Sequence, residues 1–199
     1  TLIDGPSVKE LEKKISKVFG KKYGLMVNSG SSANLLALQC LINPYRKQRL
    51  KRGDEVLIPS LCWSTSLWPI IQSGLIPKFV DVDVNTLNIN IEDLKKKVSK
   101  KTKAILIVHV LGNCTDMNEL MKIKKRNKLI LIEDTCESLG TKFKNRYLGS
   151  FGEFSTFSFY SLNPFLFVEA LKLIECFFLL YLITLLARLK LEGLLQTNE

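Results

Sequence analysis

The sequence predicts an α/β fold, a three-layer structure in which helices cover both faces of a mostly parallel sheet. The first observation is a series of short apolar runs, which are typical of strands buried on both faces. The second is that these runs alternate with segments whose apolar residues recur at helical spacing. Turn residues separate the runs, and neither a repeat nor a low-complexity linker interrupts them up to about residue 160. Such alternation indicates helical crossovers between parallel strands.

The first half of this region alternates in that way. Ser7 and Glu10 match the S-x-x-E capping box and predict a helix that carries Leu11 and ends at Gly20. A short buried strand at residues 25–27 is expected next. The following elements, in chain order, are a helix opened by residues 28–33, a strand at 55–59, a helix at 63–73 and a strand at 77–82.

The second half continues the alternation. Its most regular strand pattern is the apolar run at residues 104–110. Asp116 is expected to cap a helix that runs to Lys125. The other elements are a helix at 91–98 and strands at 129–132 and 154–159.

The charge of the chain is compatible with a small anionic substrate, and its distribution argues against a nucleic-acid partner. The formal net charge is +10, from 29 basic and 19 acidic residues, while hydrophobic content is an ordinary 46%. The lysines are scattered over predicted helices and turns, as on a solvated surface. Nucleic-acid binding would need a basic stripe interleaved with aromatic residues, and the sequence has none. We therefore expect no nucleic-acid partner.

Cysteine and histidine usage limits the metal and redox chemistry. None of the five cysteines forms a C-x-x-C pair, which indicates reduced thiols in a cytoplasmic protein. His109 is the only histidine, so the chain has no histidine-based metal cluster and we expect no metal site. The chain starts at Thr1 without a signal-peptide pattern, and we interpret it as a fragment.

The sequence changes character after residue 160. Residues 165–187 are mostly apolar, but the stretch free of charges covers only residues 176–187. A membrane span needs about 20 apolar residues. We therefore expect no membrane span, but an aberrant apolar C-terminal helix or a segment without evolved structure. The predicted division is a domain at residues 1–160 and a tail at 161–199.

Three predicted strand ends carry side chains suited to one kind of ligand. Glu133 and Asp134 end the strand at 129–132, where ligands bind in α/β sheets, although an acidic pair alone fits a solvated loop better. Residues 28–33 open a helix with hydroxyls and backbone N–H groups, which suit an anion. Trp63 could stack on a flat ring or belong to the core. Together these groups offer the phosphate cradle, stacking surface and acid that pyridoxal phosphate requires.

These motifs resemble the sugar aminotransferase and dehydratase family (DegT type) of fold-type I pyridoxal phosphate enzymes. The resemblance covers about residues 3–160 and implies part of the large domain, whose seven-stranded sheet would be incomplete at its last strands. It is greatest to the 3-dehydratases of nucleotide-linked 4-keto-6-deoxyhexoses, and many aminotransferases of the family have Gln at the position of Glu137. The matching segments are residues 28–34, 59–66, 68–74, 79–83, 108–113, 132–140 and 149–152.

The resemblance implies roles for individual residues. Ser31, Ser32 and Ser158 would bind the cofactor phosphate. Trp63 would stack on the ring, and Asp134 would pair with the ring nitrogen and keep it charged. Glu137, in addition, would lie near the 3-oxygen of the ring.

The chain departs from the family at the catalytic position. Family aminotransferases hold the cofactor through a Lys five residues after the Ser at position 158, and the 3-dehydratases have a His there. This chain has Asn163, which can neither bond to the cofactor nor act as a base near neutral pH. His109 is a weak substitute, because its strand-end motif favours a packed histidine. We therefore expect an inactive catalytic position at Asn163.

The function implied is dehydration at C3 of a nucleotide-linked 4-keto-6-deoxy sugar in polysaccharide or lipopolysaccharide biosynthesis, with pyridoxal phosphate or pyridoxamine phosphate as cofactor. Two alternatives stay open: a nucleotide-sugar aminotransferase and a non-catalytic truncated product. Family members are usually homodimers, and whether this chain dimerises is also left open. The family's small C-terminal domain has no counterpart here.

Overall fold

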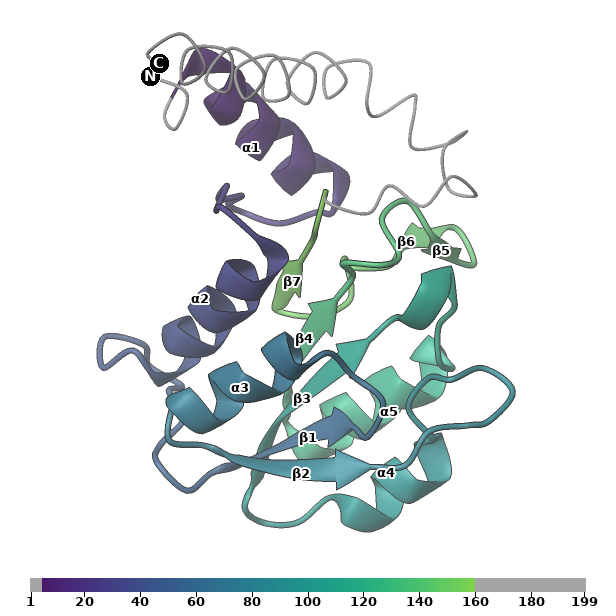
Figure 1. Cartoon of the computed structure of the whole chain (residues 1–199). Coiled ribbons are helices and arrows are strands. Elements are labelled where there is room, and N and C mark those ends of the chain that lie inside the picture. The colour runs from purple at the N-terminus through teal and green to yellow at the C-terminus, as the bar shows by residue number, and fades with distance from the viewer. Residues whose placement is uncertain (1–4, 160–199) are drawn as a thin grey trace, which may run out of the picture. The chain divides into compact units, whose positions relative to one another are not determined.

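The computed structural model describes residues 5–159, and in them a five-stranded sheet carries helices on both faces (Figure 1). Every pair of neighbouring strands in this sheet is parallel, so the predicted α/β class with a mostly parallel sheet is confirmed. The strands, in spatial order, are β2 (Ile76–Val80), β1 (Glu55–Pro59), β3 (Thr102–Val108), β4 (Ile130–Asp134) and β7 (Phe154–Thr156).

Side chains that alternate along the strands build two separate cores. On one face, α2 (Gly30–Ile42) and α3 (Ser64–Gln72) cover the even-numbered residues of β1, β3 and β4, such as Leu106 and Ile132. On the other face, α4 (Ile91–Lys97) and α5 (Met117–Asn127) cover odd-numbered residues such as Leu131. Each fully buried Leu or Ile contributes about 1.5–3 kcal/mol. Because the side-chain period of a strand is two, adjacent residues of one strand lie on opposite faces of the sheet.

The first helix does not use the predicted capping box. Helix α1 (Pro6–Val18) begins before Ser7, with Gly5 as its N-cap and no side-chain cap. Proline has its φ already set for the first helical turn, and its missing N–H would have no intrahelical partner there. Pro6 therefore starts the helix two positions before Val8, the first helical residue that a cap at Ser7 would give.

The predicted strand at residues 25–27 is wrong. A strand needs a neighbour for its backbone groups, and these residues pair with no strand among those described. Instead the N–H of Met26 donates to the Glu12 carboxylate at 2.8 Å. Leu25 is 68% exposed, and Met26 and Val27 are only half-buried, so the apolar run marked neither a buried segment nor a strand.

The other predicted elements are present with shifted ends. Strand β4 continues to residue 134, so Glu133 and Asp134 are its last two residues and both are buried. The predictions missed three short elements, whose two or three residues are too few to carry a period. They are η1 (Val110–Gly112) and the hairpin of β5 (Lys142–Phe143) and β6 (Arg146–Tyr147).

The tail predicted at residues 161–199, its apolar helix and Asn163 lie outside the described residues. The domain boundary near residue 160 therefore stays a prediction. Among residues 5–159, no helix is both long and apolar enough to cross a membrane.

Candidate active site

The structure brings most of the predicted site residues to the ends of neighbouring strands. Asp134 is the last residue of β4, and Ser158 follows β7. Trp63 comes after β1 and is the N-cap of α3. Ser31 and Ser32 lie in the first turn of α2, the helix that packs beside α3 (Figure 1).

Asp134 is a buried carboxylate held by neutral donors. Its side chain is 3% exposed, and its Oδ2 accepts hydrogen bonds from Asn34 Nδ2 and Ser66 Oγ, both at 2.8 Å. Its Oδ1 accepts the backbone N–H of Cys136 at 3.2 Å. A carboxylate offers about four acceptor positions, and the fourth faces only the weakly donating Cys136 thiol, which a ligand could replace. No described lysine or arginine pairs with Asp134, although a buried charge normally requires a partner.

The Glu133 side chain lies on the opposite face of the sheet from Asp134 and binds backbone N–H groups instead. Its Oε1 accepts the N–H groups of Phe151 and Gly152 at 2.7 and 2.5 Å, and its Oε2 accepts the N–H of Gly149 at 2.8 Å. Burial pushes the pKa of Glu133 up, but His109 and these N–H groups outweigh burial and leave that pKa below its ordinary value. Glu133 is therefore the anchor of the 149–152 turn.

His109 is packed, as the sequence indicated. Its side chain is 1% exposed, and its Nε2 lies 3.4 Å from Glu133 Oε2. This contact places His109 on the face opposite to Asp134, so it cannot replace the residue expected at position 163.

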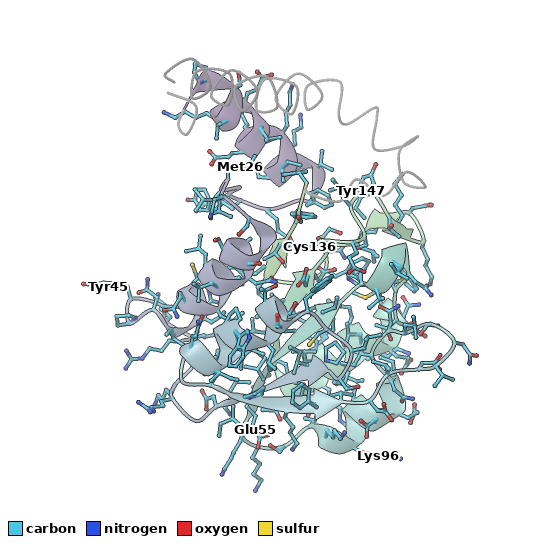
Figure 2. The ribbon with its side chains drawn as sticks, viewed as in Figure 1. Met26, Tyr45, Glu55, Lys96, Cys136 and Tyr147 are labelled. Carbon is cyan, nitrogen blue, oxygen red and sulfur yellow. The ribbon has the colours of Figure 1, made fainter. Side chains whose placement is uncertain are left out.

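The amino-terminal end of α2 has the form of an anion site. Ser29 caps the helix by accepting the N–H of Ser32 at 3.1 Å, and other N–H groups of a first turn have no intrahelical partner. A Cβ added to Gly30 would lie 3.2 Å from Ser158 Cβ and 2.8 Å from Cys136 Sγ. Glycine thus allows the helix end to approach both Ser158 and Cys136, and Figure 2 labels Cys136 near the start of α2.

The thiol of Cys136 is held in its protonated form. Burial is the largest cause that raises its pKa, and the charge of Asp134 adds to it. A protonated thiol is a weak nucleophile. Cys136 therefore gives the site two donors to Asp134, its backbone N–H and its weakly donating thiol, and no reactive group.

Trp63 and Glu137 form a pair at the exposed side of the site. Trp63 is 64% exposed, and its indole Nε1 donates to Glu137 Oε1 at 2.7 Å. The other oxygen of Glu137 accepts the N–H of Leu111 at 2.9 Å. Leu111 has a φ of 51°, the left-handed region that non-glycine residues rarely adopt. Glu137 thereby ties the indole to the η1 turn and leaves the face of the indole open to a ring.

Sequence reasoning missed the residues that hold Asp134. Asn34 shares one face of α2 with Ala37, Leu38 and Leu41, at spacings of three, four and seven. A polar side chain on such an apolar face has to find a buried partner. That pattern could have identified Asn34, but its partner lies 100 residues away in sequence and needs the fold.

Comparison with known proteins agrees with this geometry. The model of the DegT/DnrJ/EryC1/StrS aminotransferase family matches residues 1–170. The GDP-4-keto-6-deoxy-D-mannose 3-dehydratase of Escherichia coli O55:H7 is 51% identical over 158 residues, which are 79% of this chain and 40% of that protein. The GDP-perosamine synthase of Escherichia coli O157:H7 is 36% identical over 156 residues, 78% of this chain and 41% of that protein.

A solved structure of similar fold is also available for comparison. It is an E. coli GDP-4-keto-6-deoxy-D-mannose-3-dehydratase with bound hydrated PLP, with a TM-score of 0.71 and 50% sequence identity. The match covers 74% of this chain and 38% of that one. This chain thus spans about two fifths of the length of these relatives.

Proposed function

Because this chain belongs to the DegT/DnrJ/EryC1/StrS aminotransferase family, we propose that it supplies the cofactor-binding sheet of a sugar-modifying enzyme. The cofactor is pyridoxal phosphate or its amino form, pyridoxamine phosphate. The substrate is a nucleotide-linked 4-keto-6-deoxy sugar, and the reaction is removal of the hydroxyl group at C3. The greater identity to the 3-dehydratase, 51% against 36% for the perosamine synthase, supports this reaction class.

The observation that carries this proposal is the state of Asp134. A buried carboxylate without a cation among the described residues is costly, and the penalty for an unpaired buried ion is several kcal/mol. A protonated ring nitrogen would supply both the missing positive charge and a hydrogen bond to the remaining position on Oδ1. Asp134 therefore fits this cofactor better than it fits an empty core.

The neighbouring residues fit the rest of the cofactor. The Trp63 indole, held at its edge by Glu137, offers a flat face to the ring. Ser31, Ser32 and Ser158 surround the helix end that suits the phosphate. When bound, the charged ring withdraws electrons from the substrate carbon attached to it. The chain's own residues orient the ring, hold its charge and bind its phosphate.

The asparagine at position 163 affects catalytic turnover more than it affects binding of the cofactor. An amide neither bonds covalently to the cofactor nor moves a proton near neutral pH. We therefore propose that the chain binds its cofactor non-covalently and is itself inactive. A sugar aminotransferase and a non-catalytic product remain the alternatives.

Fluorescence of single-tryptophan variants tests cofactor binding. The full chain has two tryptophans, so Trp68→Phe leaves only Trp63 as reporter, and Trp63→Phe leaves only Trp68. Pyridoxal phosphate should quench Trp63 more strongly than Trp68, because only Trp63 stacks on the ring. Equal quenching of both, or none, would contradict the proposed site.

The reaction class can be tested with Asn163→His. Supplied with pyridoxamine phosphate and GDP-4-keto-6-deoxymannose, this variant should give a 4-keto sugar with hydrogen in place of the C3 hydroxyl, while the pyridoxamine phosphate is converted to pyridoxal phosphate and ammonia. Amino-group transfer to the sugar would favour the aminotransferase, and no product would favour the non-catalytic alternative.

A further inference from the structure

We propose that Asn34 is a positioning residue, which determines that Oδ1 of Asp134, and not Oδ2, faces the ring nitrogen of the cofactor. This inference rests on the proposed function, because it concerns how the same site receives the same cofactor. It adds a role for a residue that touches neither ring nor phosphate.

The orientation of the Asn34 amide is fixed on both sides. Asn34 Nδ2 donates to Asp134 Oδ2 at 2.8 Å, while Asn34 Oδ1 accepts from Thr156 Oγ1 at 2.7 Å. Turning the amide over would place its oxygen against the carboxylate, so two acceptors would meet. Asn34 is 2% and Thr156 4% exposed, so water does not replace these contacts.

Thr156 is itself anchored to the sheet. It pairs with Asp134 in the parallel register of β7 and β4. Its carbonyl oxygen accepts both the N–H and the hydroxyl of Thr135, at 2.9 and 2.6 Å. The chain of hydrogen bonds thus runs from β7 through Asn34 to the carboxylate, and every member is buried.

This network leaves the carboxylate one available acceptor. Asn34 and Ser66 fill both lone pairs of Oδ2, and the Cys136 N–H fills one lone pair of Oδ1. The Cys136 thiol, a weak donor, also hydrogen-bonds this carboxylate, so the ring N–H would replace the thiol at the remaining lone pair of Oδ1. Without Asn34, Oδ2 would keep a free lone pair and the carboxylate could turn about its χ2 torsion, which is soft. The ring would then meet a carboxylate that is not held in the binding geometry.

Asn34 also joins the two ends of the cofactor site. It lies on α2 about one turn after Ser31 and Ser32, so one helix presents both the phosphate cradle and the donor to Asp134. Ser66 makes the corresponding link from α3, which begins after Trp63. Two helices that contact separate parts of the cofactor are thereby tied to one carboxylate.

The test compares two ligands that differ only at the ring nitrogen. The full chain and its variants are titrated with pyridoxal phosphate and with its deaza analogue, in which C–H replaces the ring nitrogen. The parent should prefer pyridoxal phosphate by about tenfold or more, as for a charge-assisted hydrogen bond. Asn34→Ala should reduce this preference to about twofold, and binding of the deaza analogue should change little.

Further variants separate positioning from folding. Thr156→Val removes the hydroxyl that orients Asn34, and it should also lower the preference, whereas Thr156→Ser should keep most of it. Asn118→Ala, at an exposed asparagine in the first turn of α5, is the matched control and should keep the preference of the parent. If Asn34→Ala gives no thermal unfolding transition, the comparison of Thr156→Val with Thr156→Ser decides.

The outcomes distinguish this inference from the proposed function. If Asn34→Ala or Thr156→Val weakens both ligands equally, Asn34 has only a structural role and the inference is wrong, while the cofactor site stands. If the parent binds both ligands equally well, or binds neither, Asp134 does not contact the ring nitrogen. The proposed cofactor role of Asp134 then fails together with the inference.

Discussion

Replacing Glu133 by glutamine should destabilise the fold by about 3 kcal/mol. Glu133 accepts three backbone N–H groups of the 149–152 turn. In the cheaper of its two orientations, glutamine turns its NH₂ group toward Gly149 and leaves that N–H unpaired, which costs about 1–3 kcal/mol. The other two bonds lose their charge assistance, at about 0.5–1 kcal/mol each. This is a large part of the about 5–15 kcal/mol that stabilises a typical domain.

Urea unfolding of the full chain followed by circular dichroism measures this loss. The matched control is Glu92→Gln, because the Glu92 side chain is 72% exposed and the change should stay within about 0.5 kcal/mol. A loss below about 1 kcal/mol for Glu133→Gln would refute the reasoning that the buried carboxylate anchors the turn.

The same variant makes a prediction about pH. The folded-state pKa of Glu133 lies below its ordinary value of 4.5, so its stabilisation is fully present above that pH. It is lost as the pH falls through the lowered folded-state pKa. The difference between parent and Glu133→Gln should therefore shrink in acid, and a difference independent of pH would contradict the assigned pKa direction.

Three further predictions concern other parts of the chain. Borohydride treatment with pyridoxal phosphate should give no adduct at Asn163, and a mass shift in a peptide containing that residue would contradict this. Cys136 should be alkylated slowly at neutral pH in the native chain and quickly in denaturant, because its pKa is raised by burial and by Asp134. A chain that ends near residue 160 should be at least as soluble as the full chain, since exposed apolar side chains favour association; losing the cooperative thermal transition would show that the tail belongs to a core.

The sequence predicted the sheet well because buried parallel strands have an unmistakable composition. Runs such as residues 104–107 are apolar throughout, and alternation with helices leaves few other architectures. The segment at 25–27 has the same character but lacks a partner strand among the described residues. Leu25 is 68% exposed and its two neighbours are only half-buried, so a short apolar run alone establishes neither burial nor a ladder, which depends on what lies next to it in space.

The candidate site was predicted in part, through motifs whose residues act locally. Asp134, Trp63 and the serines at the start of α2 follow strand ends, and the topology brings strand ends together. The hydrogen-bond partners of Glu133 and Asp134 could not be predicted, because they depend on which face of the sheet each side chain lies on. Glu133 and Asp134 are adjacent in the strand, so their side chains lie on opposite faces of the sheet. Glu133 therefore binds the 149–152 turn, and Asp134 binds Asn34.

The most direct test of the account is the affinity of Asp134→Asn for pyridoxal phosphate, measured by calorimetry on the full chain. Asparagine keeps the size of the side chain and removes the charge that would pair with the ring nitrogen. A charge-assisted hydrogen bond contributes about 1.5–3 kcal/mol, so the account predicts at least about tenfold weaker binding than in the parent, while the control Asp116→Asn, on the exposed N-cap of α5, binds as the parent does. Equal affinities of parent and Asp134→Asn would contradict the claim that this carboxylate holds the cofactor ring.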